Sequence, residues 1–201
     1  MRVPRVSEQH RAARKDQILA AAVRCVARQG FHKTTMADVI AEAELSAGAV
    51  YLYFRSKDDI IRALAHRSIG RVAQILAAMA DRVPAVRPEE ALQEALEELL
   101  ALAAPGDDLL RVGVQAWGEA LRDAAVRETV STELRALRNN LAAIVRRAQQ
   151  DRLMDGAAEP ERVAAFLCGA IPGFILQQLV LGDVSPASYV DGLRALVSQR
   201  P

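Results

Sequence analysis

The fold that this 201-residue sequence predicts is an all-helical one of about nine helices, on three observations. Apolar residues recur at three- and four-residue spacing in several long segments, and none shows sustained alternation of apolar and polar residues. Ala and Leu are abundant in a hydrophobic share of 51%, whereas the aromatic residues, which favour strands, make up 4%. Helix-capping residues and Pro or Gly recur between the apolar segments.

The N-terminal third predicts a long helix followed by two short ones. The long helix is expected over residues 8–29, after a basic arm at residues 1–7, and Gly30 is its expected left-handed stop. Thr35 with Asp38 carries the signal of a capping box, so a short helix should begin directly behind it, at residue 36, and run to about residue 43.

Ser46 can cap a second short helix over about residues 47–53. Two short helices with a three-residue break and basic surroundings form the pattern of a helix-turn-helix, which places its second helix in the major groove of DNA. Within that second helix, we expect Val50 and Phe54 to face inward.

The rest of the chain predicts six further helices. Ser56 with Asp59 repeats the capping signal for a long helix to about Val83. A helix from Pro88 ends at Pro105–Gly106, and Asp107 can cap the next helix, which is apolar over most of its circumference and is expected to be central and buried. The last three are expected at about 126–153, 160–181 (kinked at Pro172) and 187–198.

Positive charge is concentrated in the first quarter of the chain. Residues 1–57 hold ten Lys and Arg against five Asp and Glu, whereas residues 58–201 hold 16 against 20. This division predicts a polyanion-binding head on a body that does not itself touch the polyanion, although chance segregation of surface charge is the alternative. We therefore expect a DNA-binding domain at 1–56 and a second domain at 57–201.

The sequence offers no constellation of an enzyme. His10, His32 and His66 are scattered without metal-ligand spacing, and there is no glycine-rich phosphate loop, so no catalytic residue, metal site or cofactor is expected. Cys25 and Cys168 are predicted to be buried thiols in a reducing compartment. With no apolar run of 18 residues and no signal-peptide core, a cytoplasmic protein without a membrane partner is expected.

Residues 11–60 resemble the DNA-binding domain of the TetR family of bacterial transcriptional regulators. That family's pattern is a threonine-capped helix, a turn ending in Ser, then Ser-x-Gly-x-x-Tyr-x-Tyr-Phe, and Lys at the start of a long helix. Eight residues carry it here, namely Thr34, Thr35, Ser46, Gly48, Tyr51, Tyr53, Phe54 and Lys57. Two positions depart from it: Ile40 stands where the family usually has Ala, and Glu44 where it has Gly. The Gly usually takes a left-handed conformation, which costs a Glu about 1 kcal/mol more.

Most expected DNA contacts position the protein without reading sequence. Helix N-termini bind phosphate, and tyrosine hydroxyls and basic side chains add further phosphate contacts. The recognition helix presents small residues and none that reads guanine or adenine bidentately, so we expect DNA shape and residues outside it to supply much of the specificity. For the two tyrosines of the set, a packing role is the alternative. The predicted DNA-binding residues are Arg14, Lys33, Thr34, Thr35, Ser46, Ala47, Gly48, Ala49, Tyr51, Tyr53 and Lys57.

The resemblance also implies two tasks for the body. One is homodimerisation through the last two helices, where Gly169, Ala170 and Gly173 would suit a close helix crossing. The other is effector binding in an apolar cavity, although large apolar residues at helical spacing more often fill a core. The candidate effector-binding residues are Ile75, Met79, Trp117, Leu121, Phe166, Phe174 and Gln177.

These features together predict a homodimeric transcriptional repressor. It would bind a palindromic double-stranded operator and leave it when a small apolar or amphipathic effector shifts the long helix that begins at Ser56. The alternative is an all-helical interaction protein whose helix-turn-helix no longer binds DNA. Ile40, Glu44 and the shortage of base-reading side chains support that alternative.

Overall fold

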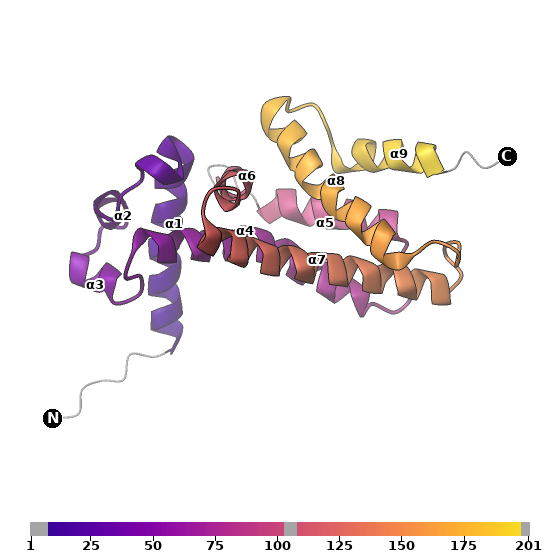
Figure 1. Cartoon of the computed structure of the whole chain (residues 1–201), viewed down its shortest axis with the longest axis horizontal. Helices are drawn as coiled ribbons and strands as arrows, with labels where there is room; N and C mark the ends of the chain where they lie inside the picture. The colour runs from indigo at the N-terminus through magenta and orange to yellow at the C-terminus, as the bar shows by residue number, and fades with distance from the viewer. Residues whose placement is uncertain (1–7, 103–107, 198–201) are drawn as a thin grey trace.

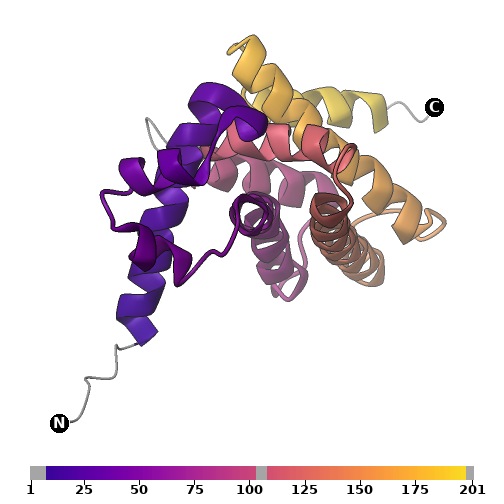
Figure 2. The same cartoon turned by 60° about the vertical axis from the view of Figure 1, so that its left-hand side comes forward.

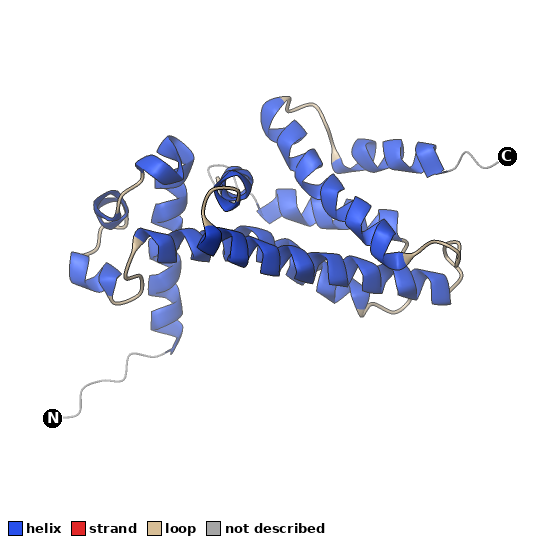
Figure 3. Cartoon of the chain, viewed as in Figure 1, coloured by secondary structure: helices blue, strands red, loops and turns tan. Residues whose placement is uncertain are grey.

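The computed structural model describes residues 8–102 and 108–197, and these fold into nine α-helices without a strand (Figures 1 and 3). The all-helical prediction is confirmed. The predicted basic arm, the stop at Pro105–Gly106 and the cap at Asp107 lie outside the described residues. The helices are α1 (Glu8–Lys33), α2 (Met36–Glu42), α3 (Ala47–Tyr51), α4 (Lys57–Ala80), α5 (Pro88–Leu102), α6 (Leu109–Ala120), α7 (Ala124–Gln150), α8 (Pro160–Val180) and α9 (Pro186–Val197).

The three N-terminal helices form a head at one end of the molecule (Figures 1 and 2). From it, α4 and α7 run side by side into the body, and α8 packs across α7. α9 packs on α5, so the described chain ends at the far side of the body from the head. α6 crosses between the two parts, because it contacts α1 in the head as well as α4, α7 and α8.

The buried apolar residues form two clusters, and α4 belongs to both. The first joins the head to the first half of α4, to α6 and to the start of α7, with Ile18, Val50, Leu64 and Val112 among its fully buried members. The second joins the rest of α4 to α5, α7, α8 and α9. Head and body therefore share the first cluster, and α4 extends from it into the second.

Several helices end earlier than the sequence predicts, among them α3 and α4. α3 stops at Tyr51 because the amides of Tyr53 and Phe54 both turn back to the Val50 carbonyl, at 3.0 Å each. α4 stops at Ala80 rather than Val83, and Asp81 follows it as the C-cap. Val83 itself precedes Pro84, and a residue before proline is disfavoured in the α conformation. At the end of α1, Gly30 adopts φ 80° as predicted, although helical turns resume beyond it up to Lys33.

α6 is not buried around its whole circumference, which corrects the prediction. Only Val112, Ala116 and Ala120 are buried. Its other apolar residues line a cavity, described below, and Leu121 beyond its end is 82% exposed. One apolar face of α6 therefore packs in the core, and the other lines the cavity.

α8 runs without interruption from Pro160 to Val180. It passes through Pro172, the position at which the sequence predicts a kink. By length and composition alone, α8 is also apolar enough to cross a membrane, a test that the core helix of a soluble protein passes too. Only 28% of its most apolar stretch is buried in the chain. Much apolar surface of α8 therefore faces outward.

Glu44, in the turn between α2 and α3, adopts φ 55°, the left-handed region that glycine enters at least cost. We expect Glu44→Gly to raise the free energy of unfolding by about 1 kcal/mol, and so to raise the Tm by about 2–4 °C. Differential scanning calorimetry measures both quantities. The control is Ala41→Gly, on the exposed side of α2, where a glycine should instead lower the free energy of unfolding. Two changes of equal sign would contradict the interpretation.

Candidate DNA-binding surface and ligand cavity

Side-chain caps define the start of α2, α3 and α4, as the sequence predicts. Thr35 Oγ1 accepts from the amide of Asp38 at 3.1 Å, and the Asp38 carboxylate accepts from the amide of Thr35 at 2.8 Å, which completes a capping box. Ser46 Oγ accepts from the Ala49 amide at 3.3 Å. A second capping box stands at the start of α4. These caps fix where each helix of the head begins and therefore which residues each one exposes.

Charged and amide side chains of α1 brace the helix-turn-helix. Glu42, the last residue of α2, accepts from Arg24 at 2.6 Å and from Arg28 at 3.1 Å. Gln17 donates through Nε2 to the carbonyl of Ala43 at 2.8 Å. The sequence analysis did not identify this brace, because its members lie 14 to 26 residues apart.

The brace predicts a pH dependence of stability. Hydrogen bonds from Arg24 and then Arg28 hold the pKa of Glu42 below its ordinary 4.5, against a smaller opposing effect of burial. Its stabilising contribution is thus complete above 4.5 and is lost as the pH falls through the lowered folded-state value. We expect Glu42→Gln to have a lower Tm than the wild type at pH 7, and we expect this difference to shrink as the pH falls below 4.5.

The control for this prediction is Glu44→Gln, because Glu44 is exposed and has no ion pair among the described residues. Thermal unfolding of the three proteins between pH 3 and 7 should show a pH-dependent gap for Glu42→Gln alone. An equal gap in both variants would point to overall charge instead of the brace.

The outer face of α3 carries small and mostly exposed residues. Ser46, Ala47 and Gly48 are exposed, Ala49 is half-buried, and a Cβ added at Gly48 would meet nothing within 4 Å. Tyr51 on the same helix is 48% exposed. On the inner face, Val50 and Phe54 are buried, as predicted. A flat face of this kind allows a second surface, such as a DNA groove, to approach the backbone closely.

The remaining predicted DNA-contact residues surround α3 unevenly. Lys33 and Thr35 are exposed. Arg14 is half-buried and donates to Gln17 Oε1 at 2.7 Å. Lys57 donates through Nζ to the His32 carbonyl at 2.9 Å.

Thr34 and Tyr53 are the two predicted contacts that pack inward. Thr34 is 3% exposed, and its hydroxyl donates to the Gly30 carbonyl at 2.9 Å. This position corrects the prediction for the Thr34 side chain, because that hydroxyl closes the end of α1 instead of facing outward. Tyr53 is half-buried against the first apolar cluster.

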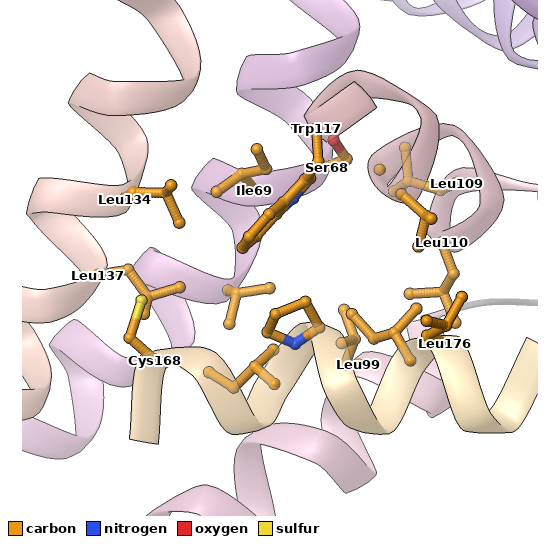
Figure 4. Close-up of a pocket in the computed structure, with 16 residues that line it drawn as sticks. Ser68, Ile69, Leu99, Leu109, Leu110, Trp117, Leu134, Leu137, Cys168 and Leu176 are labelled. Atoms are coloured by element: carbon orange, nitrogen blue, oxygen red, sulfur yellow. The ribbon is translucent and has the colours of Figure 1, made fainter. Parts of the chain in front are cut away.

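An apolar cavity of about 230 Å³ lies where α4, α5, α6, α7 and α8 meet (Figure 4). Trp117 extends into it from α6, Leu134 and Leu137 lie on one side, and Leu109 and Leu110 lie on the other. The remaining lining residues are Ser68, Ile69, Val72, Leu99, Gly113, Val114, Cys168, Ile171, Pro172, Ile175 and Leu176.

The cavity wall carries no charged group. Burial raises the pKa of the Cys168 thiol, which is therefore neutral at pH 7. The Ser68 hydroxyl donates to the Ala65 carbonyl at 3.2 Å. The space exceeds the roughly 150 Å³ of an apolar cavity that binds benzene and lies below the usual pocket range of about 300–1,000 Å³. It therefore suits a compact apolar molecule, or the apolar part of a larger one.

Of the predicted effector residues, the structure places only Trp117 in this cavity. Ile75, Met79 and Phe174 are buried in the second apolar cluster and do not line this cavity. Three others are exposed, namely Leu121, Phe166 and Gln177. Helical spacing identified the region, because α4, α6 and α8 all line the cavity, but on α4 and α8 the cavity is lined by other residues than the predicted ones.

Two side-chain contacts join the head to α6. His32, near the end of α1, places Nε2 at 3.2 Å from Glu119 Oε2 and at 3.3 Å from a guanidinium nitrogen of Arg122. Because α6 also lines the cavity, it connects the head directly to the cavity wall.

The glycines predicted at a dimer crossing fall on different sides of α8. Gly169 is exposed, and nothing lies within 4 Å of the Cβ it lacks. A Cβ at Gly173 would instead lie 3.1 Å from the Tyr189 hydroxyl of α9, and that hydroxyl donates to the Ala170 carbonyl at 3.0 Å. Gly173 and Ala170 thus serve the packing of α9 on α8 within the chain. The outward face of α8 carries Phe166 and Val180, 61% and 71% exposed.

A capped helix-turn-helix joined through shared helices to a helical body is the architecture of one class of proteins, the DNA-binding transcriptional regulators. Comparison with known proteins agrees. The family model described as "Bacterial regulatory proteins, tetR family" matches residues 18–64, and that described as "BetI-type transcriptional repressor, C-terminal" matches residues 88–200. The chain belongs to the TetR family and is a DNA-binding transcriptional repressor, not an enzyme.

Three similar proteins illustrate the relationship. The HTH-type transcriptional repressor Rv1474c of Mycobacterium tuberculosis is 30% identical over 184 residues, covering 82% of this chain and 95% of the relative. The structure of Salmonella enterica GusR superposes with a TM-score of 0.76 at 20% identity, over 97% of both chains. SmeT, the repressor of a Stenotrophomonas maltophilia multidrug efflux pump, superposes as its triclosan complex with a TM-score of 0.72 at 21% identity, over 92% of this chain and 91% of SmeT.

Proposed function

We propose that the protein acts as a cytoplasmic homodimer that binds a palindromic operator and leaves it when a small apolar or amphipathic molecule occupies the cavity. One observation carries the proposal. The helices α4 and α6 both line the cavity, and both pack against α1 of the head. A ligand that favours one placement of these helices also favours one placement of the head.

The head supplies the proposed DNA contacts. We assign groove contact to the exposed residues from Ser46 to Tyr51 on and around α3, and phosphate contact to Lys33, Thr35, Lys57 and Arg14. The domains proposed are residues 1–56 for DNA binding and 57–201 for effector binding and dimerisation. We propose that the protein recognises its sequence mainly through DNA shape, because the α3 face carries no side chain for bidentate base readout.

Dimerisation is supported by the outward apolar face of α8. Monomeric proteins rarely leave large apolar patches in water, and Phe166 and Val180 are mostly exposed on this helix. A twofold pair would also present two copies of α3 to successive major grooves, whereas one five-residue helix contacts little DNA by itself.

Effector binding is supported by the cavity and by a relative of the same fold. SmeT was solved as a complex with triclosan. The cavity described above is apolar, uncharged and large enough for a comparable small molecule.

Selection of bound duplexes from a random pool tests DNA binding and dimerisation together. We expect enrichment of a palindrome whose half-sites lie about 34–36 Å apart or at a multiple of that distance. Binding of the selected duplex should weaken steeply with salt. Failure to enrich any duplex would favour the alternative, an interaction protein whose helix-turn-helix has lost DNA binding. Enrichment of a single half-site would contradict the dimer.

A further inference from the structure

A second hollow, of about 520 Å³, lies between α1 and α4 and differs from the cavity in its charge. We propose that this cleft binds the anionic head group of an amphipathic effector whose apolar part occupies the cavity. The inference rests on the proposed effector binding and names the chemical class of the ligand. The cleft is lined by Lys15, Asp16, Leu19, Ala63, His66, Arg67, Arg71, Gln74 and Leu109.

Cations outnumber carboxylates in and around the cleft. Lys15, Arg67 and Arg71 face Asp16, which lies 3.4 Å from the guanidinium of Arg67. The only other carboxylate in contact with a lining residue of the described chain is Glu133, 2.5 Å from His66. Positive charge is therefore in excess whether or not His66 is protonated.

Two of the three cationic side chains that line the cleft form no ion pair within the described chain. In the described parts of the chain, Lys15 and Arg71 contact no carboxylate within 4 Å, and only Arg67 is paired. The side-chain amide of Gln74 adds a neutral donor. Two unpaired cations and an amide in a concave site suit a carboxylate or, better, a phosphate group.

The two hollows share a wall. Leu109, the first residue of α6, lines both of them. On α4, Arg67 and Arg71 face the cleft, while the neighbouring Ser68 and Val72 face the cavity. Together with Leu19 and Ala63, Leu109 gives the cleft an apolar side, so one ligand can keep its chain on apolar surface and its charge among cations.

Occupation of the cleft would act directly on the head. Lys15 and Asp16 belong to α1, whereas Arg67 and Arg71 belong to α4. An anion between them competes with Asp16 for Arg67 and so replaces an ion pair that joins head and body. The charge of the effector, and not only its apolar volume, would then determine the placement of the head.

Isothermal titration calorimetry with octyl phosphate and 1-octanol tests the inference, because the two probes share a chain and differ in head group. For the wild type we expect octyl phosphate to bind at least about tenfold more tightly than 1-octanol. In the double variant Lys15→Gln/Arg71→Gln, that advantage should fall to about twofold, with 1-octanol affinity unchanged. Arg87→Gln, exposed and outside both hollows, is the matched control and should behave as the wild type.

The inference would be overturned if the two probes bound with equal affinity or if neither bound. It would also be overturned if Arg87→Gln lost the advantage of octyl phosphate to the same extent as the double variant. A DNA phosphate could also occupy the cleft. The double variant should therefore bind the selected duplex as the wild type does without ligand, and a parallel loss of duplex affinity with unchanged octyl phosphate affinity would assign the cleft to DNA. If octyl phosphate binds through the cleft but leaves duplex affinity constant, the inference stands and effector-driven release fails.

Discussion

The double substitution Phe166→Glu/Val180→Glu is expected to make the protein monomeric and to lower its affinity for a palindromic operator by about 10²–10⁴-fold. Both side chains are on the outward face of α8 and are mostly exposed within the chain. In the proposed dimer they would be buried, where an unpaired carboxylate is strongly disfavoured. Loss of the partner removes the avidity that two linked heads provide.

Sedimentation velocity measures the mass, and fluorescence anisotropy of a labelled duplex measures the affinity. The control is Leu121→Glu, which places one carboxylate on an apolar and exposed position outside α8. It should remain dimeric. A double variant that stays dimeric would exclude this face of α8 as the interface, whereas a monomer with full operator affinity would show that dimerisation is not needed for binding.

Gly48→Glu is expected to lower operator affinity by at least about a hundredfold, because like charges brought together at an interface cost several kcal/mol. Within the protein the substitution has room, since no atom lies within 4 Å of the added Cβ. A carboxylate in the first turn of α3 also suits the helix dipole. The Tm should therefore stay the same or rise slightly.

Gly118→Glu is the matched control, because Gly118 is also an exposed helical glycine with open space around it, but on α6. Thermal unfolding and anisotropy should show two folded variants that differ in DNA binding alone. If Gly48→Glu retains wild-type affinity, the outer face of α3 does not approach DNA.

The features that sequence predicted best are those that neighbouring residues determine. The caps at Thr35, Ser46 and Ser56 each depend on a side chain and an amide three residues away. The sequence pattern therefore identifies the hydrogen-bonded pair directly. The inward orientation of Val50 and Phe54 follows from helical geometry in the same way. The left-handed turn at Glu44 was predictable from the glycine that the family carries at this position.

The cavity could not be located from sequence, because spacing gives the inward face of a helix but not what fills the space opposite. Met79 and Trp117 are both apolar residues on inward faces, yet Met79 packs into a filled core and Trp117 borders an empty volume. The difference depends on neighbours from four helices. The small residues Ser68 and Gly113, which leave room for that volume, carry no signal of their own.

The cationic cleft was equally hidden in the sequence. Lys15 and Arg71 stand 56 positions apart, and each reads as an ordinary solvated charge until α1 crosses α4. Thr34 matched the family pattern as a contact residue, but its hydroxyl has an internal acceptor four residues earlier, the Gly30 carbonyl.

Shared packing around α4 limits how far this head can be exchanged between relatives. A chimera joined at residue 56 would keep Val50 and Phe54 but lose Ile60, Leu64 and Val112, on which the head packs. Residues 1–56 alone should not fold, and a foreign body would have to match the head surface as closely as a cognate one. Transplanting the specificity of this regulator therefore calls for changing surface residues of α3 in place, with the packing beneath them left intact.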